Sequence, residues 1–260
     1  MRVEGKNGIV TGAAKGIGAE ITLTLAQEGA DLVLAARDVG ALEIMAKQVS
    51  DLGRRVKIVK TDVTIESEVV NMANVAREFF SDRIDILVNV AGVTGPIETP
   101  AWEINVEDFD FVLKSNVCGT FLPIKHVIPS MISQKNGKIV NVGGTSGLRG
   151  YKHRTAYSSS KWAVRGLTRT VALDAGEYGI NVNVVCPGIV HGPRMDNLCE
   201  EKAKVRGWSR DEVYNEYVQE MALRRVTEAQ DIADAVLFLA SSESRNMTGQ
   251  EITVDGGWDV

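Results

Sequence analysis

The sequence is poor in the residues that form disulfides and bind metals. It has three cysteines and three histidines among 260 residues. Cys118, Cys186 and Cys199 are odd in number, lie far apart and show no metal-ligand spacing, and the histidines are equally scattered. This pattern excludes a secreted disulfide framework and argues against a metal centre. We therefore expect no bound metal, reduced thiols in a cytoplasmic protein, and Cys118 and Cys186 in the core.

Long apolar runs and an excess of basic charge are also missing. No apolar run reaches the roughly 18 residues that span a bilayer, and Met1–Lys6 is polar, so we expect neither a membrane span nor a secretory signal. The formal net charge is -5, from 29 Lys and Arg against 34 Asp and Glu. Nucleic acids and anionic membranes are not attracted to an acidic surface. A small molecule is therefore the expected partner.

No linker, internal repeat, low-complexity tract or block of like charges divides the chain. With 44% hydrophobic residues, residues 1–260 are expected to form a single domain with a large core. Short apolar runs alternate with amphipathic segments, which is typical of a parallel sheet covered by helices on both faces. The apolar runs predict seven strands, at Gly8–Val10, Asp31–Ala35, Val56–Lys60, Ile84–Asn89, Lys138–Val142, Asn181–Cys186 and Glu251–Val254.

A tyrosine and a lysine lie one helical turn apart in the segment Ala156–Ala163. If this segment is helical, Tyr157 and Lys161 leave the same face of the helix and can meet. A free phenol, with a pKa of about 10, is a poor acid or base near neutrality, but a fixed ammonium nearby stabilises the phenolate. Tyr157 is therefore a candidate acid and base, which gives a proton to a carbonyl oxygen or takes one from an alcohol. An isolated pair of this kind is more often two ordinary helix residues, so its context decides.

That context is a glycine-rich turn near the N-terminus. The first predicted strand leads into Thr11–Gly18, and an amphipathic segment follows. A strand, a glycine turn and a helix in this order let backbone N–H groups and a helix N-terminus hold a pyrophosphate. Gly12 would permit the tight turn, Gly16 the close approach of the phosphate, and Gly18 the packing of the helix on the strand.

With these and several further motifs, nearly the whole chain resembles the single-domain type of the short-chain dehydrogenase/reductase family. The matching segments are Thr11–Gly18, Asp62–Val63, Asn89–Gly92, Asn116, Tyr157–Lys161, Pro187–Gly188 and Asp255–Gly257. The resemblance implies an α/β fold, a Rossmann-like doubly wound sheet of seven parallel strands with ligands at their carboxyl ends. It implies helices near Ile17–Glu28, Val39–Leu52, Glu66–Phe80, Asp108–Gln134, Tyr157–Tyr178 and Ala229–Ala240.

The resemblance also implies a flap and an assembly. The segment at about 191–225, which is charged and irregular from roughly Met195 to Arg225, resembles the family's substrate-covering helical flap. Family members of this type form homotetramers, so a homotetramer is expected. Trp162 and Trp258 are candidate interface anchors, although core packing would explain either one equally well.

The family's site residues carry over onto matching positions. Asp62 and Val63 are expected beside the adenine ring, and Lys161 is expected to hold the nicotinamide ribose as well as to assist Tyr157. Asn116 is expected to support a proton relay through a water at Lys161, with satisfaction by backbone alone as the alternative. Asn89 is as much structural as cofactor-binding. The residues expected to contact the cofactor are Gly12, Lys15, Gly16, Ile17, Gly18, Arg37, Asp62, Val63, Asn89, Ala91, Gly92, Tyr157, Lys161, Pro187, Gly188 and Val190.

The end of the second predicted strand bears on the choice of dinucleotide. NAD-preferring members of the family carry Asp at the position of Ala36, where a carboxylate accepts hydrogen bonds from the ribose 2′-OH and repels a 2′-phosphate. Arg37 follows, and Lys15 lies in the glycine turn, so two cations could flank that phosphate. We therefore predict a preference for NADP(H). NAD(H) is the alternative if Arg37 and Lys15 are solvated surface charges or are offset by Asp38.

The sequence departs from the family at one catalytic position. Thirteen residues before the tyrosine, where members usually have the serine that holds the substrate oxygen, this chain has Gly144. Three explanations are open. Ser146, or less favourably Thr145, could supply the hydroxyl from the same loop, or a substrate hydroxyl or a water could take its place. Alternatively, the protein could bind dinucleotide with little or no turnover. We favour Ser146. One lost hydrogen bond to an oxyanion typically lowers the rate by about 10²–10³, which need not abolish activity.

Cationic residues gather around the catalytic motif and at the start of the flap. They are Arg149, Lys152, His153, Arg154 and Arg194. A guanidinium is well suited to a carboxylate, phosphate or sulfonate. We therefore include the hypothesis that the substrate carries an anionic group.

The expected function is that of an NADP(H)-dependent oxidoreductase that interconverts a secondary alcohol and a ketone by hydride transfer. Tyr157 is the expected acid/base, with Lys161, Asn116 and Ser146 as the other catalytic residues. One alternative is an NAD-dependent alcohol dehydrogenase. A second, less favoured, is a dinucleotide-binding module with weak or no turnover, which Gly144 motivates. The substrate, its stereochemistry and the physiological direction stay open at this stage.

Overall fold

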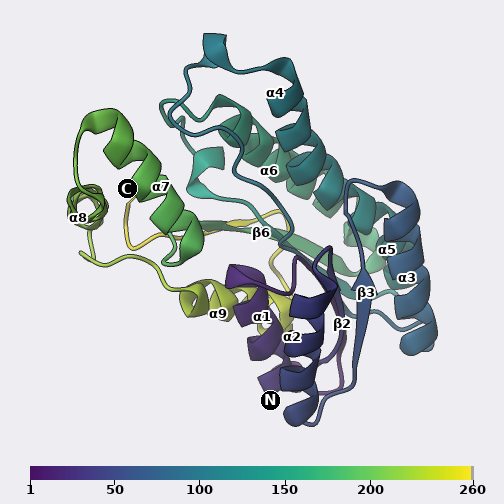
Figure 1. Ribbon diagram of the computed structural model, residues 1–260. Coiled ribbons are helices and arrows are strands. Elements are labelled where there is room, and N and C mark those ends of the chain that lie inside the picture. The colour runs from purple at the N-terminus through teal and green to yellow at the C-terminus, as the bar shows by residue number, and fades with distance from the viewer. Residues whose placement is uncertain (259–260) are drawn as a thin grey trace.

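Seven parallel strands form one sheet in the computed structural model, which describes residues 1–258 (Figure 1). Their spatial order is β3-β2-β1-β4-β5-β6-β7. The order reverses direction between β1 and β4, so the sheet is doubly wound and its carboxyl edge opens a crevice there. The strands are β1 (Asn7–Thr11), β2 (Asp31–Ala36), β3 (Val56–Lys60), β4 (Ile86–Asn89), β5 (Gly137–Val142), β6 (Ile180–Pro187) and β7 (Glu251–Val254). The predicted fold is confirmed, with all seven strands where the apolar runs place them.

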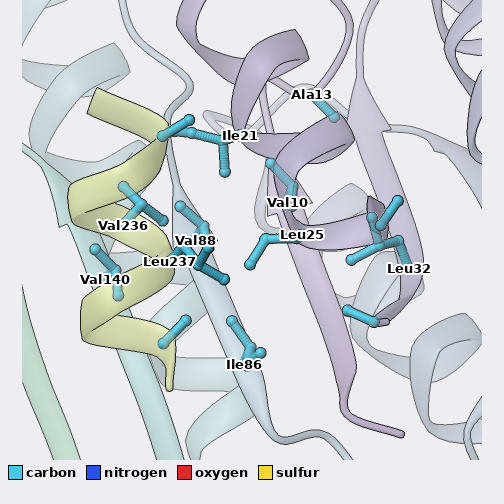
Figure 2. Close-up of a cluster of buried hydrophobic side chains, with 14 of the residues drawn as sticks. Val10, Ala13, Ile21, Leu25, Leu32, Ile86, Val88, Val140, Val236 and Leu237 are labelled. Atoms are coloured by element: carbon cyan, nitrogen blue, oxygen red, sulfur yellow. The ribbon is translucent and has the colours of Figure 1, made fainter. Parts of the chain in front are cut away.

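One face of the sheet is covered by α1 (Gly16–Gln27), α2 (Val39–Asp51) and α9 (Ala229–Ala240). Figure 2 shows Val10 and Val88 of the sheet close to Leu25 of α1 and Val236 of α9. All four side chains are fully buried. Successive residues of a strand point to opposite faces, so this core takes every second apolar residue of β1 and β4.

The other face takes the alternate residues. Ile9 of β1 and Leu87 of β4 pack here against α3 (Glu66–Phe79), α5 (Gly119–Gln134) and α6 (Thr155–Ala175). Met72 of α3 and Val127 of α5 are fully buried in the same cluster. Because both faces are covered, the central strands carry consecutive apolar residues, such as Ile9–Val10 and Ile86–Val88, which explains why their sequences show apolar runs rather than alternation.

The range expected to be helical, Asp108–Gln134, is helical throughout but does not form a single α-helix. α4 (Val106–Leu113) leads into a π-helical segment, Lys114–Cys118, and α5 begins only at Gly119. A π-helical turn inserts an extra residue into a helix and is often found at functional sites. Cys118, expected in the core, is exposed on this segment, so that expectation was wrong, whereas Cys186 is buried as expected.

The flap expected at about 191–225 contains two helices, α7 (Pro193–Arg206) and α8 (Arg210–Glu220), as the resemblance to a helical flap implies. Their ends have ordinary helix signals: Pro193 opens α7, and Ser209 and Glu212 form a capping box on α8. They stand apart from the helices that cover the sheet, on the left of Figure 1. The two helices share a small core of their own, made of Met195, Cys199, Ala203, Val213, Tyr217, Met221 and Val226. Within the described chain, no helix has both the length and the apolar composition needed to cross a membrane.

Candidate active site

A cavity of about 1350 Å³ lies at the carboxyl edge of the sheet. The loops that follow β1 to β6 line it, and α7 and α8 close one side. Every residue expected from the sequence to act in catalysis or cofactor binding lines this cavity, except Asn89 and Asn116. No group of three or more His, Cys, Asp or Glu side chains within residues 1–258 could hold a metal ion.

The glycine turn after β1 has the geometry of an anion cradle. Gly12 has a φ of +67°, and a Cβ atom there would lie 2.8 Å from the backbone nitrogen of Ala91. At Gly18 a Cβ would lie 2.0 Å from the carbonyl oxygen of Gly12, so only glycine lets α1 start this close to β1. Gly16, at φ +54°, has open space around the corresponding position.

The N-terminus of α1 at this turn is uncapped. No side chain caps it within the described residues, and its first turn holds no acidic residue. The first N–H groups of a helix have no partner within the helix, and its dipole attracts negative charge. Gly16, Ile17 and Gly18 line the cavity here. The residues present therefore fit a dinucleotide pyrophosphate.

The two cations expected at the adenosine end each lie beside a carboxylate. The Lys15 ammonium is 2.6 Å from a carboxylate oxygen of Asp38, and the Arg37 guanidinium is 3.9 Å from one of Asp62. Hydrogen bonds from Lys15 and then from a backbone N–H lower the pKa of Asp38. All these groups except Asp62 are largely exposed, so the pairs are weak and open to competition. Ala36, at the end of β2, presents no carboxylate.

Tyr157 and Lys161 lie in the first two turns of α6, on the face that borders the cavity. The Lys161 ammonium is 5.5 Å from the centre of the Tyr157 ring and donates a hydrogen bond to the carbonyl of Val142, at 3.0 Å. Lys161 is only 7% exposed, and burial lowers its pKa while Tyr157 opposes the shift. A cation thus stands beside a phenol in a poorly solvated wall, where electrostatic interactions are strong.

Asn116 holds the loop after β4 against α6 rather than entering the cavity. Its side-chain oxygen accepts a hydrogen bond from the Val93 N–H at 2.8 Å. Its side-chain nitrogen donates to the Val93 carbonyl at 3.0 Å and to the Ser160 hydroxyl at 2.9 Å. The partners are therefore one backbone segment and the side chain next to Lys161, so the amide is not satisfied by backbone alone.

Asn89 belongs to a buried chain of hydrogen bonds. Its side-chain nitrogen donates to the side-chain oxygen of Asn141 at 2.9 Å, and the Asn141 nitrogen donates to the Thr168 hydroxyl at 2.9 Å. This chain ties the ends of β4 and β5 to α6. Asn89 does not line the cavity, so the contacts that it makes are structural ones.

Gly144 occupies the place from which a side chain would reach the Tyr157 hydroxyl. A Cβ atom on Gly144 would lie 3.7 Å from that oxygen and 3.8 Å from the carbonyl of Pro187. The φ of Gly144 is 163°, an extended conformation that any residue adopts. At Gly143, by contrast, a Cβ would lie 2.9 Å from Val184. Packing therefore requires glycine at position 143 and does not require it at 144.

The two neighbouring hydroxyls differ in availability. Thr145 is 2% exposed, and its hydroxyl accepts a hydrogen bond from the Tyr151 hydroxyl at 3.1 Å. Ser146 is partly exposed, lines the cavity and has no hydrogen-bond partner for its hydroxyl among residues 1–258. Of the two, Ser146 is the hydroxyl left open to a ligand.

An aromatic wall on the substrate side was not found from the sequence. The rings of Tyr151 and Trp258 have centres 5.0 Å apart, and Tyr217 of α8 meets Trp258 edge-on at 5.8 Å. The Trp258 indole N–H donates to Glu220 at 2.8 Å, which fixes this wall to the flap. These residues are separated by up to 107 positions in the chain, so no local pattern could have joined them.

Comparisons with known proteins agree with this geometry. A family model described as enoyl-(acyl carrier protein) reductase matches residues 12–259. Dehydrogenase/reductase SDR family member 6 of Danio rerio is 33% identical over 264 residues, which cover 99% of this chain and 98% of that protein. The crystal structure of NAD⁺-bound xylitol dehydrogenase has a TM-score of 0.95 at 33% identity, with 99% and 100% of the two chains covered. An actinorhodin polyketide ketoreductase with NADPH has a TM-score of 0.92 at 29% identity, with 97% of each chain covered.

Proposed function

Since the chain belongs to the short-chain dehydrogenase/reductase family and is an oxidoreductase acting on CH–OH or C=O groups, we propose that it interconverts a secondary alcohol and a ketone with NADP(H) and uses Tyr157 as its acid/base. The observation that carries this proposal is the position of Tyr157 and Lys161 on one wall of the cavity, with an uncapped helix N-terminus at its other end. The substrate is proposed to carry an anionic group.

The bound dinucleotide supplies and accepts the hydride. In the reductive direction Tyr157 gives its hydroxyl proton to the carbonyl oxygen, and in the oxidative direction its phenolate takes the alcohol proton. Lys161 stabilises the phenolate by its charge. One of its three N–H donors is engaged by Val142, which leaves two for the nicotinamide ribose. Asn116 supports the relay by fixing Ser160, the neighbour of Lys161.

Separate parts of the cavity would hold the cofactor. Gly12–Gly18 would take the pyrophosphate, Asp62 and Val63 the adenine, and Pro187–Val190 the nicotinamide. The NADP(H) preference is supported by Ala36, which leaves no carboxylate at the ribose, and by the two nearby cations. NAD(H) is the second candidate, because Asp38 and Asp62 already neutralise those cations.

The proposal is tested with Tyr157→Phe and a panel of ketones and secondary alcohols, followed by nicotinamide absorbance. The variant keeps the ring and loses the proton, so turnover should fall by at least about 10²-fold while dinucleotide binding is unchanged. Near-normal turnover in this variant would remove Tyr157 from the mechanism. If the wild-type protein binds dinucleotide tightly but turns over no member of the panel, the binding module that Gly144 motivates is the better description.

We also propose that residues 1–260 act as one unit, with the flap at 191–225 inside it, and that the protein is a cytoplasmic homotetramer. Its three cysteines are all unpaired, which is typical of a reducing compartment. Exposed aromatic side chains on neighbouring helices support the assembly: Phe111 on α4 is 50% exposed, Phe121 on α5 43%, and Trp162 on α6 48%. Large apolar side chains grouped on a surface are typical of interfaces.

A further inference from the structure

Arg154 is partly buried beside the reacting tyrosine, and one terminal nitrogen of its guanidinium is unsatisfied. It precedes α6, and its guanidinium carbon lies 4.8 Å from the centre of the Tyr157 ring. One terminal nitrogen, Nη2, makes a long hydrogen bond of 3.5 Å to the Thr94 carbonyl. The other, Nη1, is buried and has no partner among the described residues. Burial lowers the pKa of Arg154, so this charge is held away from water.

An unpaired, desolvated guanidinium N–H is unfavourable unless something fills its place. The nearby carboxylate does not fill it: Glu98 pairs with His153 at 3.6 Å, and its influence on Arg154 is only through space. Arg154 lines the same cavity as Tyr157 and Lys161. The missing partner is therefore expected from a bound molecule.

The two cations nearest to the flap differ in their surroundings. Lys202 stands over the Tyr217 ring at 4.7 Å and lies in the field of three carboxylates, those of Glu98, Glu216 and Glu220. Of these carboxylates only Glu98 acts on Arg154, and it makes no ion pair with it among residues 1–258. Arg154 is therefore the cation with an unmet place for an anion.

The position of Arg154 limits where the anion can sit. Its guanidinium lies against the ring that carries the reacting hydroxyl, so the anionic group and the reacting carbon must be close neighbours within one small molecule. A planar carboxylate can bond to both terminal nitrogens of a guanidinium at once. In Arg154, Nη1 has no hydrogen-bond partner and the hydrogen bond of Nη2 is long, so neither nitrogen is firmly engaged. A doubly charged phosphate is less suited, since Glu98 lies near enough to act on the same guanidinium.

We propose that Arg154 anchors the carboxylate of the substrate, so that the enzyme interconverts short hydroxy acids and oxo acids whose carboxylate is one or two carbons from the reacting carbon. This inference rests on the proposed function, because it names the substrate class for the same site. Hydride and proton enter the ketone as in the proposed reaction, and the carboxylate is unchanged.

The test compares an oxo acid with its neutral ester. 3-Oxobutanoate and methyl 3-oxobutanoate share the reacting ketone and differ in charge. We expect Arg154→Gln to lower kcat/KM for the acid by about 10- to 100-fold, the effect of losing charge-assisted hydrogen bonds, and to change kcat/KM for the ester less than about threefold. Arg154→Lys, which keeps the charge but not the fork, should give an intermediate value. Arg55→Gln is the matched control, since Arg55 is also an arginine but is paired with Asp31 and lies outside the cavity, so neither substrate should be affected.

Binding measurements distinguish the carboxylate contact proposed for Arg154 from the reaction proposed for Tyr157. In Tyr157→Phe, which keeps the ring under Arg154, calorimetry with dinucleotide present should show the acid binding about tenfold or more tightly than in the Tyr157→Phe/Arg154→Gln double variant. If this difference is found without turnover in the wild type, the anchor stands and the proposed reaction does not. Equal losses for acid and ester in Arg154→Gln, or no loss for the acid, would overturn the anchor and leave the reaction standing. A ketone phosphate ester that reacts better than the acid would overturn the carboxylate assignment.

Discussion

The hydroxyl oxygen of Tyr157 lies 3.7 Å from the point that a Cβ atom on Gly144 would occupy. The backbone of Gly144 is extended and would accept any residue, so the space beside the hydroxyl is not a by-product of a turn that needs glycine. The family's usual serine is thus replaced by an opening next to the reacting group. The proposed mechanism then needs its second donor to the substrate oxygen from another residue, and Ser146 has the hydroxyl available for it.

Replacing Ser146 tests whether its hydroxyl takes the place of the family's usual serine. We expect Ser146→Ala to lower kcat by at least about tenfold while dinucleotide binding stays intact, because one hydrogen bond to the developing oxyanion is lost. Adding Gly144→Ser in the same chain should restore most of the loss, since a Cβ atom there would lie 3.7 Å from the Tyr157 hydroxyl and meet nothing closer. Steady-state kinetics on one ketone, with fluorescence titration of the dinucleotide, measures both effects. Near-normal turnover in Ser146→Ala would leave the substrate or a water as the donor.

Arg37 provides the test of dinucleotide preference. We expect Arg37→Ala to lower kcat/KM with NADPH by about tenfold or more and to change the value with NADH by less than about threefold, because only the former carries a 2′-phosphate. Arg55→Ala is the control: Arg55 is also an exposed arginine paired with an aspartate, Asp31, but it lies outside the cavity. Equal losses with both dinucleotides in Arg37→Ala would contradict the NADP(H) preference.

The homotetramer depends on the exposed aromatic residues of α4, α5 and α6. A carboxylate at position 162 would be buried unpaired in such an interface, which is strongly unfavourable. We therefore expect Trp162→Glu to dissociate the assembly to smaller species at micromolar concentration, as measured by light scattering coupled to size-exclusion chromatography. Trp208→Glu, at a similarly exposed tryptophan in the flap, should leave the mass unchanged. A wild-type protein that runs as a monomer would rule out the assembly.

The sheet could be predicted from the sequence because its strands are buried on both faces and read as apolar runs between turns. Residues such as Ile9 and Val10, which enter opposite cores, carry that signal locally. The π-helical segment could not be predicted in this way, because Asn116 bonds to Val93 and Ser160, which lie 23 and 44 positions away. Half of the residues of α7 are charged and only a few, such as Cys199, face its small core, so no apolar pattern marked the bounds of this helix and only the family resemblance indicated a helical flap.

In the candidate site, too, local motifs could be predicted from the sequence and long-range contacts could not. The glycine turn and the Tyr157–Lys161 pair are local motifs, so the spacing of their residues along the chain determines their geometry once the helices form. The sequence could not show which arginine and lysine side chains are paired and which are not, because pairing depends on contacts between distant segments. Arg149 and Arg154 look alike in sequence, yet Arg149 lies over the rings of Tyr151 and Trp258, whereas Arg154 stacks on Tyr157. Only the folded chain distinguishes between them.

Lys138 on β5 gives a prediction about stability that is independent of the site. Its ammonium donates hydrogen bonds to Asn181 at 2.8 Å and Ser244 at 3.2 Å, and burial, with the charge of Lys6, lowers its pKa to about 8. An unfolded lysine has a pKa of about 10.4, so between about pH 8 and pH 10 the unfolded chain binds more protons at this position than the folded one. The folded state therefore gains stability from this group as the pH rises through that range.

Lys138→Met removes this titration and leaves the other groups in place. We expect the free energy of unfolding in urea to rise less, or fall more, between about pH 7 and pH 10 in the variant than in the wild type. The two lost hydrogen bonds add a constant offset, so the slope with pH, and not the absolute value, is the measurement. Lys47→Met is the control, since Lys47 is exposed and paired with Asp51 on α2. Parallel pH profiles for Lys138→Met and the wild type would show that the Lys138 ammonium keeps the pKa of an ordinary lysine in the folded protein.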